Sequence, residues 1–339
     1  MKKIKLLILL FIPILALTLF NVKTVHANEE KIYLGGYPAG FTLYTRGAYV
    51  VGLSDVVCED DIYSPAKDAD IQIGDIILYI NDYQINTSKD ISDALKNEQE
   101  CIVQIKRGKE TLIKTITPKK NSLGEIKLGL FIKEGINGIG TITYFTDNKL
   151  GCLGHPVLND NYELLEITGG KVYDCSINGV IKSVKGRPGE LRGVISNSKE
   201  IGNLEENCTT GVYGTFDNAC SKELKSIEIG TAEMGKASIW TTLNGFSPKE
   251  YSISIIKVDT NKDDKNFVIK VTDRELLEIT GGIVQGMSGS PIVQNGKLVG
   301  AITHVFMNDP TRGFGISIEN MINHKSTNEI DINYDRHNK

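Results

Sequence analysis

The sequence predicts a mostly β chain, in which a small α+β domain precedes a strand-rich domain built as a double β-barrel. Three observations support this fold class. A helix–turn–strand pattern occupies residues 64–85, glycines and turn signals recur at short intervals beyond residue 123, and one octapeptide occurs twice in the second region. The chain of 339 residues, 40% hydrophobic and 24% charged, has the length of about two globular domains.

Residues 1–27 differ from the rest of the chain in composition. Three lysines precede an apolar run over residues 6–20, and small residues at 25–27 offer a cleavage site. This pattern is typical of an export signal. The run is shorter than the ~20 residues that span a bilayer comfortably. We therefore favour a signal peptide over an uncleaved membrane anchor, and both place the rest of the chain beyond a membrane. Residues 324–339 form a polar C-terminal tail.

Charge and cysteine content exclude two classes of function. The net charge is −4 with no basic run in the mature part, so nothing favours nucleic acid as a partner. The six cysteines contain no Cys-x-x-Cys pair, which argues against a zinc site. Export permits disulfides, and Cys208 and Cys220 are close enough in sequence to bridge a loop. Buried free thiols are the alternative.

The first domain is expected over residues 30–119. A short helical turn begins at Pro65, and residues 76–80 form a strand between two turns. Thr87 or Ser88 caps a helix in which Ile91 and Leu95 share one face. Residues 102–105 and 111–116 are the closing strands.

This order of elements, with the stretch SPAKDADIQIGDIILYINDYQI, resembles a PDZ domain. The resemblance implies that a peptide C-terminus binds as an added strand beside the helix. Ile91 and Leu95 are then expected on the helix side of the groove. Gly40, Phe41 and Leu43 are expected in the carboxylate-binding loop, although residues 39–43 depart from the Gly-Leu-Gly-Phe pattern. A degenerate groove, used only as a spacer, is the alternative.

The second domain is expected over residues 123–323, and residues 138–145 are its clearest strand. The octapeptide ELLEITGG occupies residues 163–170 and again residues 275–282. The repeat suggests two related halves, as in a double β-barrel. If the copies align, Ser176 matches Ser288 in position but lacks its flanking glycines. A coincidental surface motif is the alternative.

The stretch GMSGSP over residues 286–291, followed by a hairpin with the turn Asn295-Gly296, carries the candidate nucleophile. Glycine lets the backbone turn tightly and leaves N–H groups free to point at one spot. Ser288 is the candidate nucleophile, and the amides of Gly286 and Ser288 form a candidate oxyanion hole. The stretch is similar to the nucleophile turn of chymotrypsin-like serine peptidases. A plain loop is the alternative.

A serine nucleophile needs a base, and the base needs a group that orients it. Of the five histidines, His155 lies between a glycine and a proline and is the favoured base. His304, in the strand after the hairpin, is more plausible as a pocket or core residue.

The orienting carboxylate is open from the residues alone. Asp273, just before the second octapeptide, is a candidate, and Asp160 and Asp174 are rivals. An exposed aspartate paired with Arg274 or a lysine is the alternative for Asp273.

The whole arrangement resembles the stage IV sporulation protein B peptidase family. The resemblance is carried by the apolar N-terminus, the PDZ-like stretch, the glycine-flanked His155 and TGGIVQGMSGSPIVQNGKLVGAITHVFMNDPTRGFGI over residues 280–316. It implies a chymotrypsin-like serine endopeptidase with His155, Asp273 and Ser288 as its triad. It implies no metal and no organic cofactor.

The resemblance also implies a biological setting. Family members are exported to the space between the two membranes around the forespore, where they cut themselves near the N-terminus. They also cleave a regulatory membrane protein, which leads to activation of a late mother-cell sigma factor. The expected partners are thus protein substrates, the chain itself among them. A non-catalytic PDZ peptide-binding adaptor in the cell envelope is the alternative from another class.

Overall fold

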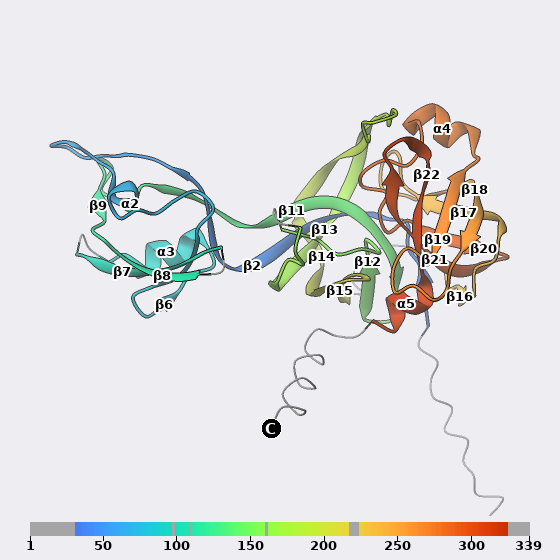
Figure 1. Ribbon diagram of the computed structural model, residues 1–339, viewed down its shortest axis with the longest axis horizontal. Coiled ribbons are helices and arrows are strands. Elements are labelled where there is room, and N and C mark those ends of the chain that lie inside the picture. The colour runs from blue at the N-terminus through green and yellow to red at the C-terminus, as the bar shows by residue number, and fades with distance from the viewer. Residues whose placement is uncertain (1–30, 97–98, 109, 160–161, 217–223, 325–339) are drawn as a thin grey trace, which may run out of the picture. The chain divides into compact units, whose positions relative to one another are not determined.

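The computed structural model describes residues 31–96, 99–108, 110–159, 162–216 and 224–324, and strands dominate these ranges (Figure 1). The expected signal or anchor over residues 1–27, Asp160, Cys220 and residues 325–339 lie outside them. Within the described ranges, every helix is too short or too polar to cross a membrane.

A small α+β domain lies between two long strands, β2 and β11. Thr87 begins the α3 helix in a capping box, because its side chain accepts from the Asp90 N–H and the Asp90 side chain accepts from the Thr87 N–H. Cys101, Val103 and Ile105 alternate inward on β7. The predicted helix and strands of this region are confirmed. The elements are β2 (Pro38–Leu53, second half), β3 (Val56–Val57), β4 (Ile62–Tyr63), α2 (Pro65–Asp68), β5 (Ile76–Ile80), β6 (Tyr83–Gln84), α3 (Ser88–Ala94), β7 (Cys101–Arg107), β8 (Glu110–Ile116), β9 (Lys119–Lys120), β10 (Ile126–Lys127) and the start of β11 (Leu130–Phe145).

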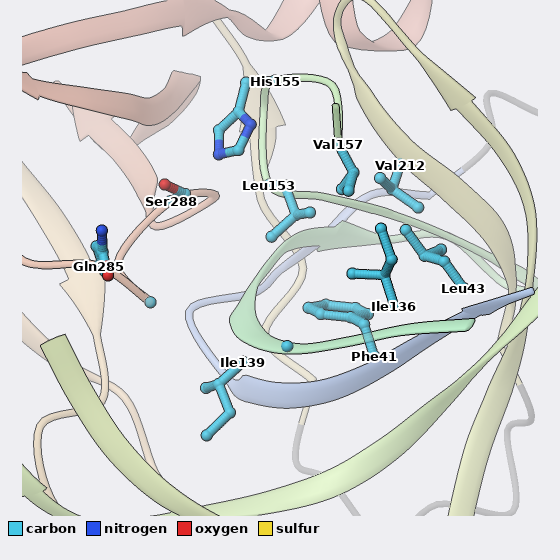
Figure 2. Close-up of a pocket in the computed structure, with 12 residues that line it drawn as sticks. Phe41, Leu43, Ile136, Ile139, Leu153, His155, Val157, Val212, Gln285 and Ser288 are labelled. Atoms are coloured by element: carbon cyan, nitrogen blue, oxygen red, sulfur yellow. The ribbon is translucent and has the colours of Figure 1, made fainter. Parts of the chain in front are cut away.

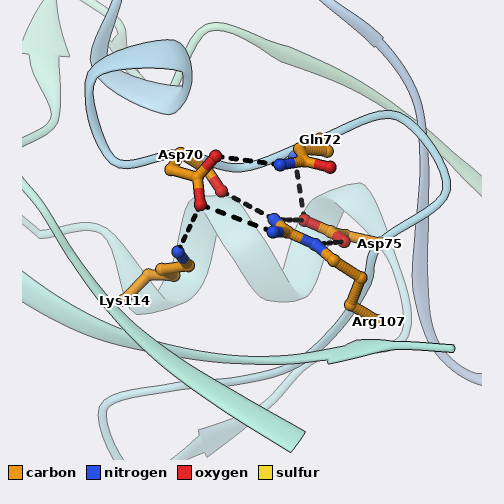
Figure 3. Close-up of polar contacts among 5 residues, drawn as sticks. All are labelled: Asp70, Gln72, Asp75, Arg107 and Lys114. Atoms are coloured by element: carbon orange, nitrogen blue, oxygen red, sulfur yellow. Dashed lines mark hydrogen bonds and ion pairs between the residues drawn. The ribbon is translucent and has the colours of Figure 1, made fainter. Parts of the chain in front are cut away.

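A polar cluster fixes the turn between α2 and β5 (Figure 3). The Asp75 carboxylate is only 1% exposed and accepts from Arg107 Nε at 2.7 Å and Arg107 Nη2 at 2.8 Å. It also accepts from the Gln72 N–H at 2.8 Å. Arg107 Nη2 in turn donates to the Asp70 carbonyl at 2.7 Å, and Lys114 pairs with the Asp70 carboxylate at 2.6 Å.

A first barrel closes through six strands in the order β2, β11, β12, β15, β14, β13 and back to β2. Its core includes Phe41, Ile142, Phe145 and Leu150. The short β1 extends one edge by pairing with β11. The elements not yet given are β1 (Tyr33–Leu34), β12 (Lys149–Cys152), β13 (Ile167–Ile181), β14 (Glu190–Cys208) and β15 (Gly211–Phe216).

The first barrel contains residues from before and after the small domain, so the chain passes between these two parts twice. Residues 38–45 belong to the first barrel, because they pair with β11 on one side and β13 on the other. The small domain begins after residue 45 and includes the start of β11, which pairs with residues 49–53 of β2. The small domain is therefore an insertion between the first two strands of the barrel, and Tyr44 lies opposite Gly135 at its base.

A second barrel closes through six strands in the order β17, β18, β19, β22, β21, β20 and back to β17. Tyr251, Ile253 and Ile255 alternate inward along β18. The predicted hairpin is confirmed, with its turn at Asn295 and Gly296. The elements are β16 (Glu228–Ile229), β17 (Gly235–Thr241), β18 (Lys249–Val258), β19 (Phe267–Val271), α4 (Arg274–Thr280), β20 (Pro291–Gln294), β21 (Lys297–Phe306), β22 (Asp309–Ser317) and α5 (Ile318–Ile322).

The double β-barrel is confirmed, but the octapeptide does not mark equivalent positions in its halves. Residues 163–170 run through a loop into β13, whereas residues 275–282 form α4 and its C-terminal turn. Ser176 lies within β13 opposite Val194, and Ser288 lies in a loop. The predicted match between Ser176 and Ser288 is therefore wrong.

Candidate active site

Ser288 lies in the loop between α4 and β20. The side chain of Met287 is 0% exposed and anchors this loop in the second barrel. Gly286 and Gly289 have φ of +95° and +91°, a region that side chains rarely adopt. A Cβ on Gly289 would lie 2.1 Å from the Thr141 carbonyl oxygen. The glycines are therefore required for the turn and for the close approach of β11.

Strand β11 of the first barrel holds this loop. The Thr141 N–H donates to the Ser288 carbonyl at 3.0 Å, and Thr141 Oγ1 donates to the Gly286 carbonyl at 2.8 Å. Thr143 Oγ1 donates to the Gly289 carbonyl at 2.8 Å. The hydrogen bonds cross from one barrel to the other, so the position of Ser288 depends on both.

Two amides of the loop are available for a ligand. The N–H groups of Met287, Gly289 and Ser290 donate to backbone carbonyls. Across the described ranges, the N–H groups of Gly286 and Ser288 have no such acceptor. These are the two amides that the sequence predicts for an oxyanion hole.

His155 follows β12 of the first barrel. Its Nδ1 lies 2.8 Å from the Pro156 carbonyl, and a carbonyl only accepts, so Nδ1 carries the proton. This tautomer leaves the lone pair of Nε2 available as a base. Burial lowers the pKa of His155, and the hydrogen bond to Pro156 opposes that shift more weakly. The ring is therefore neutral near pH 7.

His155 and Ser288 line the same cavity, whose volume is about 250 Å³ (Figure 2). Ser288 Oγ donates to the Thr303 carbonyl at 2.8 Å, so the O–H must turn away from that carbonyl before His155 can take its proton. His304 directly follows Thr303 in the chain. The centroid of its ring lies 4.8 Å from the centroid of the His155 ring. Partial burial and the neighbouring His155 lower the pKa of His304. The structure thus places His304 beside the predicted base.

Asp273 hydrogen-bonds to two backbone amides in the described residues, and its role as the orienting carboxylate stays a prediction. It is the N-cap of α4, where Oδ1 accepts from the Leu276 N–H at 3.0 Å. Its Oδ2 accepts from the Ser252 N–H at 3.1 Å. Both carboxylate oxygens of Asp273 therefore accept hydrogen bonds from backbone N–H groups. The rival Asp174, on β13, pairs with Lys199 at 2.8 Å.

The predicted peptide-binding residues of the small domain divide between two places. Gly40, Phe41 and Leu43 lie in the first barrel, because β2 pairs with a strand on each side there. Phe41 and Leu43 line the cavity of His155 and Ser288. The carboxylate-loop prediction for these three residues is therefore wrong.

Ile91 and Leu95 do line a groove on the small domain, of about 480 Å³. Residues 128–132 form its opposite wall. This wall contains Leu128-Gly129-Leu130-Phe131, which is close to the Gly-Leu-Gly-Phe pattern. This stretch stands at the C-terminal end of the small domain, whereas the pattern is expected near its start.

Comparison with curated proteins finds short matches to two kinds of serine protease. Serine protease HTRA1 of Xenopus tropicalis is 36% identical over 77 residues, which are 22% of this chain and 15% of that protein. Mitochondrial serine protease HTRA2 of Bos taurus is 38% identical over 56 residues, 16% of this chain and 12% of that protein. The chain thus spans less than a sixth of the length of these relatives.

Two solved structures are similar over longer stretches but with low scores. The inactive form of the Rv3671c protease has a TM-score of 0.33 at 12% identity, over 54% of this chain and 81% of that one. The scabies mite inactivated protease paralogue S-D1 has a TM-score of 0.30 at 13% identity, over 59% and 88%.

The sequence model of the SpoIVB peptidase S55 family matches residues 124–322. The match covers well over half of the chain. It contains the candidate base, the nucleophile loop and all of the second barrel. This chain belongs to the SpoIVB peptidase S55 family.

Proposed function

We propose that Ser288 is the nucleophile and His155 the general base of an endopeptidase that cleaves itself and a regulatory membrane protein. The proposed place is the space between the membranes around the forespore, where cleavage signals for activation of a late mother-cell sigma factor. Family membership supports the setting. One observation carries the chemistry: Ser288, His155 and two unpaired amides meet at one cavity.

In the proposed mechanism, Ser288 Oγ attacks the scissile carbonyl carbon and His155 Nε2 takes the hydroxyl proton. The N–H groups of Gly286 and Ser288 donate to the oxyanion that forms. His155 then returns the proton to the leaving amine, and the C–N bond breaks. Water then attacks the ester carbonyl of the acyl-enzyme while His155 Nε2 takes its proton. The C–Oγ bond breaks, the carboxylic acid product leaves, and His155 returns the proton to Ser288 Oγ.

The orienting group in this mechanism is a backbone carbonyl. The Pro156 oxygen holds Nδ1–H in the structure. A carbonyl fixes the tautomer as a carboxylate would, but it brings no full negative charge to stabilise the imidazolium. We therefore assign a Ser288–His155 dyad with Pro156 as the acceptor at Nδ1.

We assign peptide recognition to the groove of the small domain, as in a PDZ domain. Residues 130–133 of β11 pair with β2 along one edge. In the described part of the chain the other edge of this stretch has no strand partner and borders the groove beside α3. A peptide added there would complete the sheet and place alternate side chains against Ile91 and Leu95.

The first test is the intact mass of purified full-length protein over time, with wild type beside Ser288→Ala. Fragments that form only in wild type support a self-cleaving serine peptidase and locate the first cut. Equal fragments in both proteins would exclude Ser288 as the nucleophile. If both stay intact and neither cleaves an added peptide, the adaptor function gains support.

A further inference from the structure

We propose that the first barrel supplies an apolar subsite, which receives a medium or large apolar side chain of the substrate next to the scissile bond. This inference rests on the proposed function and names the class of substrate for it. It assigns specificity to the cavity that opens beside His155 and Ser288.

The walls of the cavity are hydrocarbon. Figure 2 shows the apolar side chains gathered on one side of His155 and Ser288, with Gln285 away from them. Phe41, Leu43 and Val212 are at most 4% exposed, so the inner wall is rigidly packed in the barrel core. The partly buried members lie nearer solvent. The main wall residues are Phe41, Leu43, Ile136, Leu153, Val157 and Val212.

The chemistry of the lining selects against polar side chains. None of the described lining residues is charged, and the polar side chains are only those of His155, Gln285 and Ser288. A charged or amide side chain that entered would lose its hydration and find no hydrogen-bond partner among the apolar walls. An apolar side chain would remove its own surface and that of the walls from water.

The volume of the cavity determines the smallest side chain that fills it well. At about 250 Å³ it exceeds the space of one water by several-fold, so an alanine side chain would leave much of it unfilled. One methylene in a hydrophobic pocket changes kcat/KM by about 10- to 200-fold. Leucine is therefore expected to exceed alanine by at least about 10-fold at the position that enters the cavity.

The test uses fluorogenic peptides in which each residue flanking the scissile bond is varied among Leu, Ala, Asp and Lys. At one position, kcat/KM is expected to be highest for Leu, lower for Ala and lowest for Asp and Lys. Val157→Phe adds volume to the cavity wall and leaves less room for a substrate side chain. It should lower the ratio of kcat/KM for the Leu peptide to kcat/KM for the Ala peptide about 10-fold at that position. Ile139→Ala widens the mouth and should shift the preference toward Phe.

Val194→Phe is the matched control, since Val194 is 60% exposed on β14 of the same barrel and does not line the cavity. Its Leu-to-Ala ratio should equal that of wild type. A ratio of rates is insensitive to the fraction of protein that folds. Binding of the Leu and Ala peptides to Ser288→Ala protein, with and without Val157→Phe, gives a second readout that needs no turnover.

Outcomes for the two proposals differ. Cleavage that depends on Ser288 but shows no apolar preference, or a preference that Val157→Phe leaves unchanged, overturns the subsite and keeps the peptidase. Cleavage that survives Ser288→Ala overturns the proposed nucleophile instead. If the Ser288→Ala protein binds Leu and Ala peptides equally, the subsite is excluded without reference to catalysis.

Discussion

Asp273 holds the first turn of α4 and one amide of the neighbouring β18, and this predicts the effect of replacing it. Asp273→Ala should lower the free energy of unfolding by about 1 kcal/mol, the usual cost of losing an N-cap. It should leave kcat/KM within a few-fold of wild type. Asp273→Asn should keep the cap at Leu276, since asparagine is as good an N-cap. Its amide nitrogen cannot accept from the Ser252 N–H, so its free energy of unfolding should lie between those of wild type and Asp273→Ala, with kcat/KM within a few-fold of wild type. Urea unfolding and peptide cleavage measure the two.

The same pair of variants separates the cap from a triad member. Replacing the aspartate of a Ser-His-Asp triad by the isosteric asparagine lowers kcat about 10⁴-fold in a chymotrypsin-like peptidase. A loss of that size in Asp273→Asn, with stability at least that of Asp273→Ala, would return Asp273 to the catalytic machinery.

The buried His155 predicts a shifted pH profile. Burial lowers its pKa below the ordinary 6.5, and only the neutral ring can act as a base. Activity therefore rises with pH through this pKa, and the midpoint of the acid limb of kcat/KM should fall below pH 6.5. His304 is the titratable group whose ring faces His155. The charges of Asp264 and Lys265 in turn influence the pKa of His304.

The pH-rate profile of wild type and of His304→Gln measures this shift. The profile of His304→Gln should keep a midpoint below pH 6.5, because burial is the main cause of the shift at His155. A wild-type midpoint at or above pH 6.5 would contradict the burial of His155 in the working enzyme.

The local surroundings of Ser288 and His155 were predictable from sequence, because the backbone around each is unusual locally. Both stand beside glycines, and the Ser288 turn needs them at φ near +90°. The hydrogen-bond acceptor at His155 Nδ1 could not be predicted, since it is a backbone group. This acceptor is the carbonyl of Pro156, which every sequence offers and no residue type marks.

At the scale of elements, the octapeptide ELLEITGG demonstrates that eight identical residues do not fix a conformation. The second copy is helical because Asp273 caps its start and Gly281 ends it with φ of 70°. At the start of the first copy the Glu163 N–H donates to Asn159 Oδ1, and the glycines of this copy pair with β2. The flanking residues and the partner strands decide between the two.

The ion pair of Arg107 and Asp75 predicts the stability of the small domain. Arg107→Ala leaves the 1% exposed Asp75 carboxylate without its cation. Removing one partner of a buried pair costs about 3–5 kcal/mol, and we expect about 3 kcal/mol because Arg107 is 28% exposed. Lys127→Ala, which removes an exposed pair with Glu125, is the control and should cost less than about 1 kcal/mol.

Urea unfolding would measure the loss in free energy of unfolding. Hydrogen exchange on residues 70–107 would show whether that loss lies in the small domain. Equal stability of Arg107→Ala and Lys127→Ala would contradict a structural role for the cluster. Loss of exchange protection confined to the small domain would support it.

At the scale of the molecule, the fold class was predictable but the path of the chain was not. Turn signals and alternating strands identified a β-rich second region. The sequence could not reveal that residues 38–45 close a barrel whose next strand comes some ninety residues later along the chain. Strands that serve two domains, as β2 and β11 do, leave no compositional break where the domains part.

The neighbouring positions of Tyr44 and Gly135 imply that the small domain is removable. Replacing residues 46–133 by Asn-Gly would join β2 to β11 as a two-residue hairpin. The shortened chain should keep both barrels, by circular dichroism, and cleave short peptides through Ser288. It should lose affinity for peptides that need the groove. A barrel that fails to fold would contradict this. A module whose two ends lie side by side on neighbouring strands is added or removed by a single change in the gene, with the order of the barrel strands unaltered.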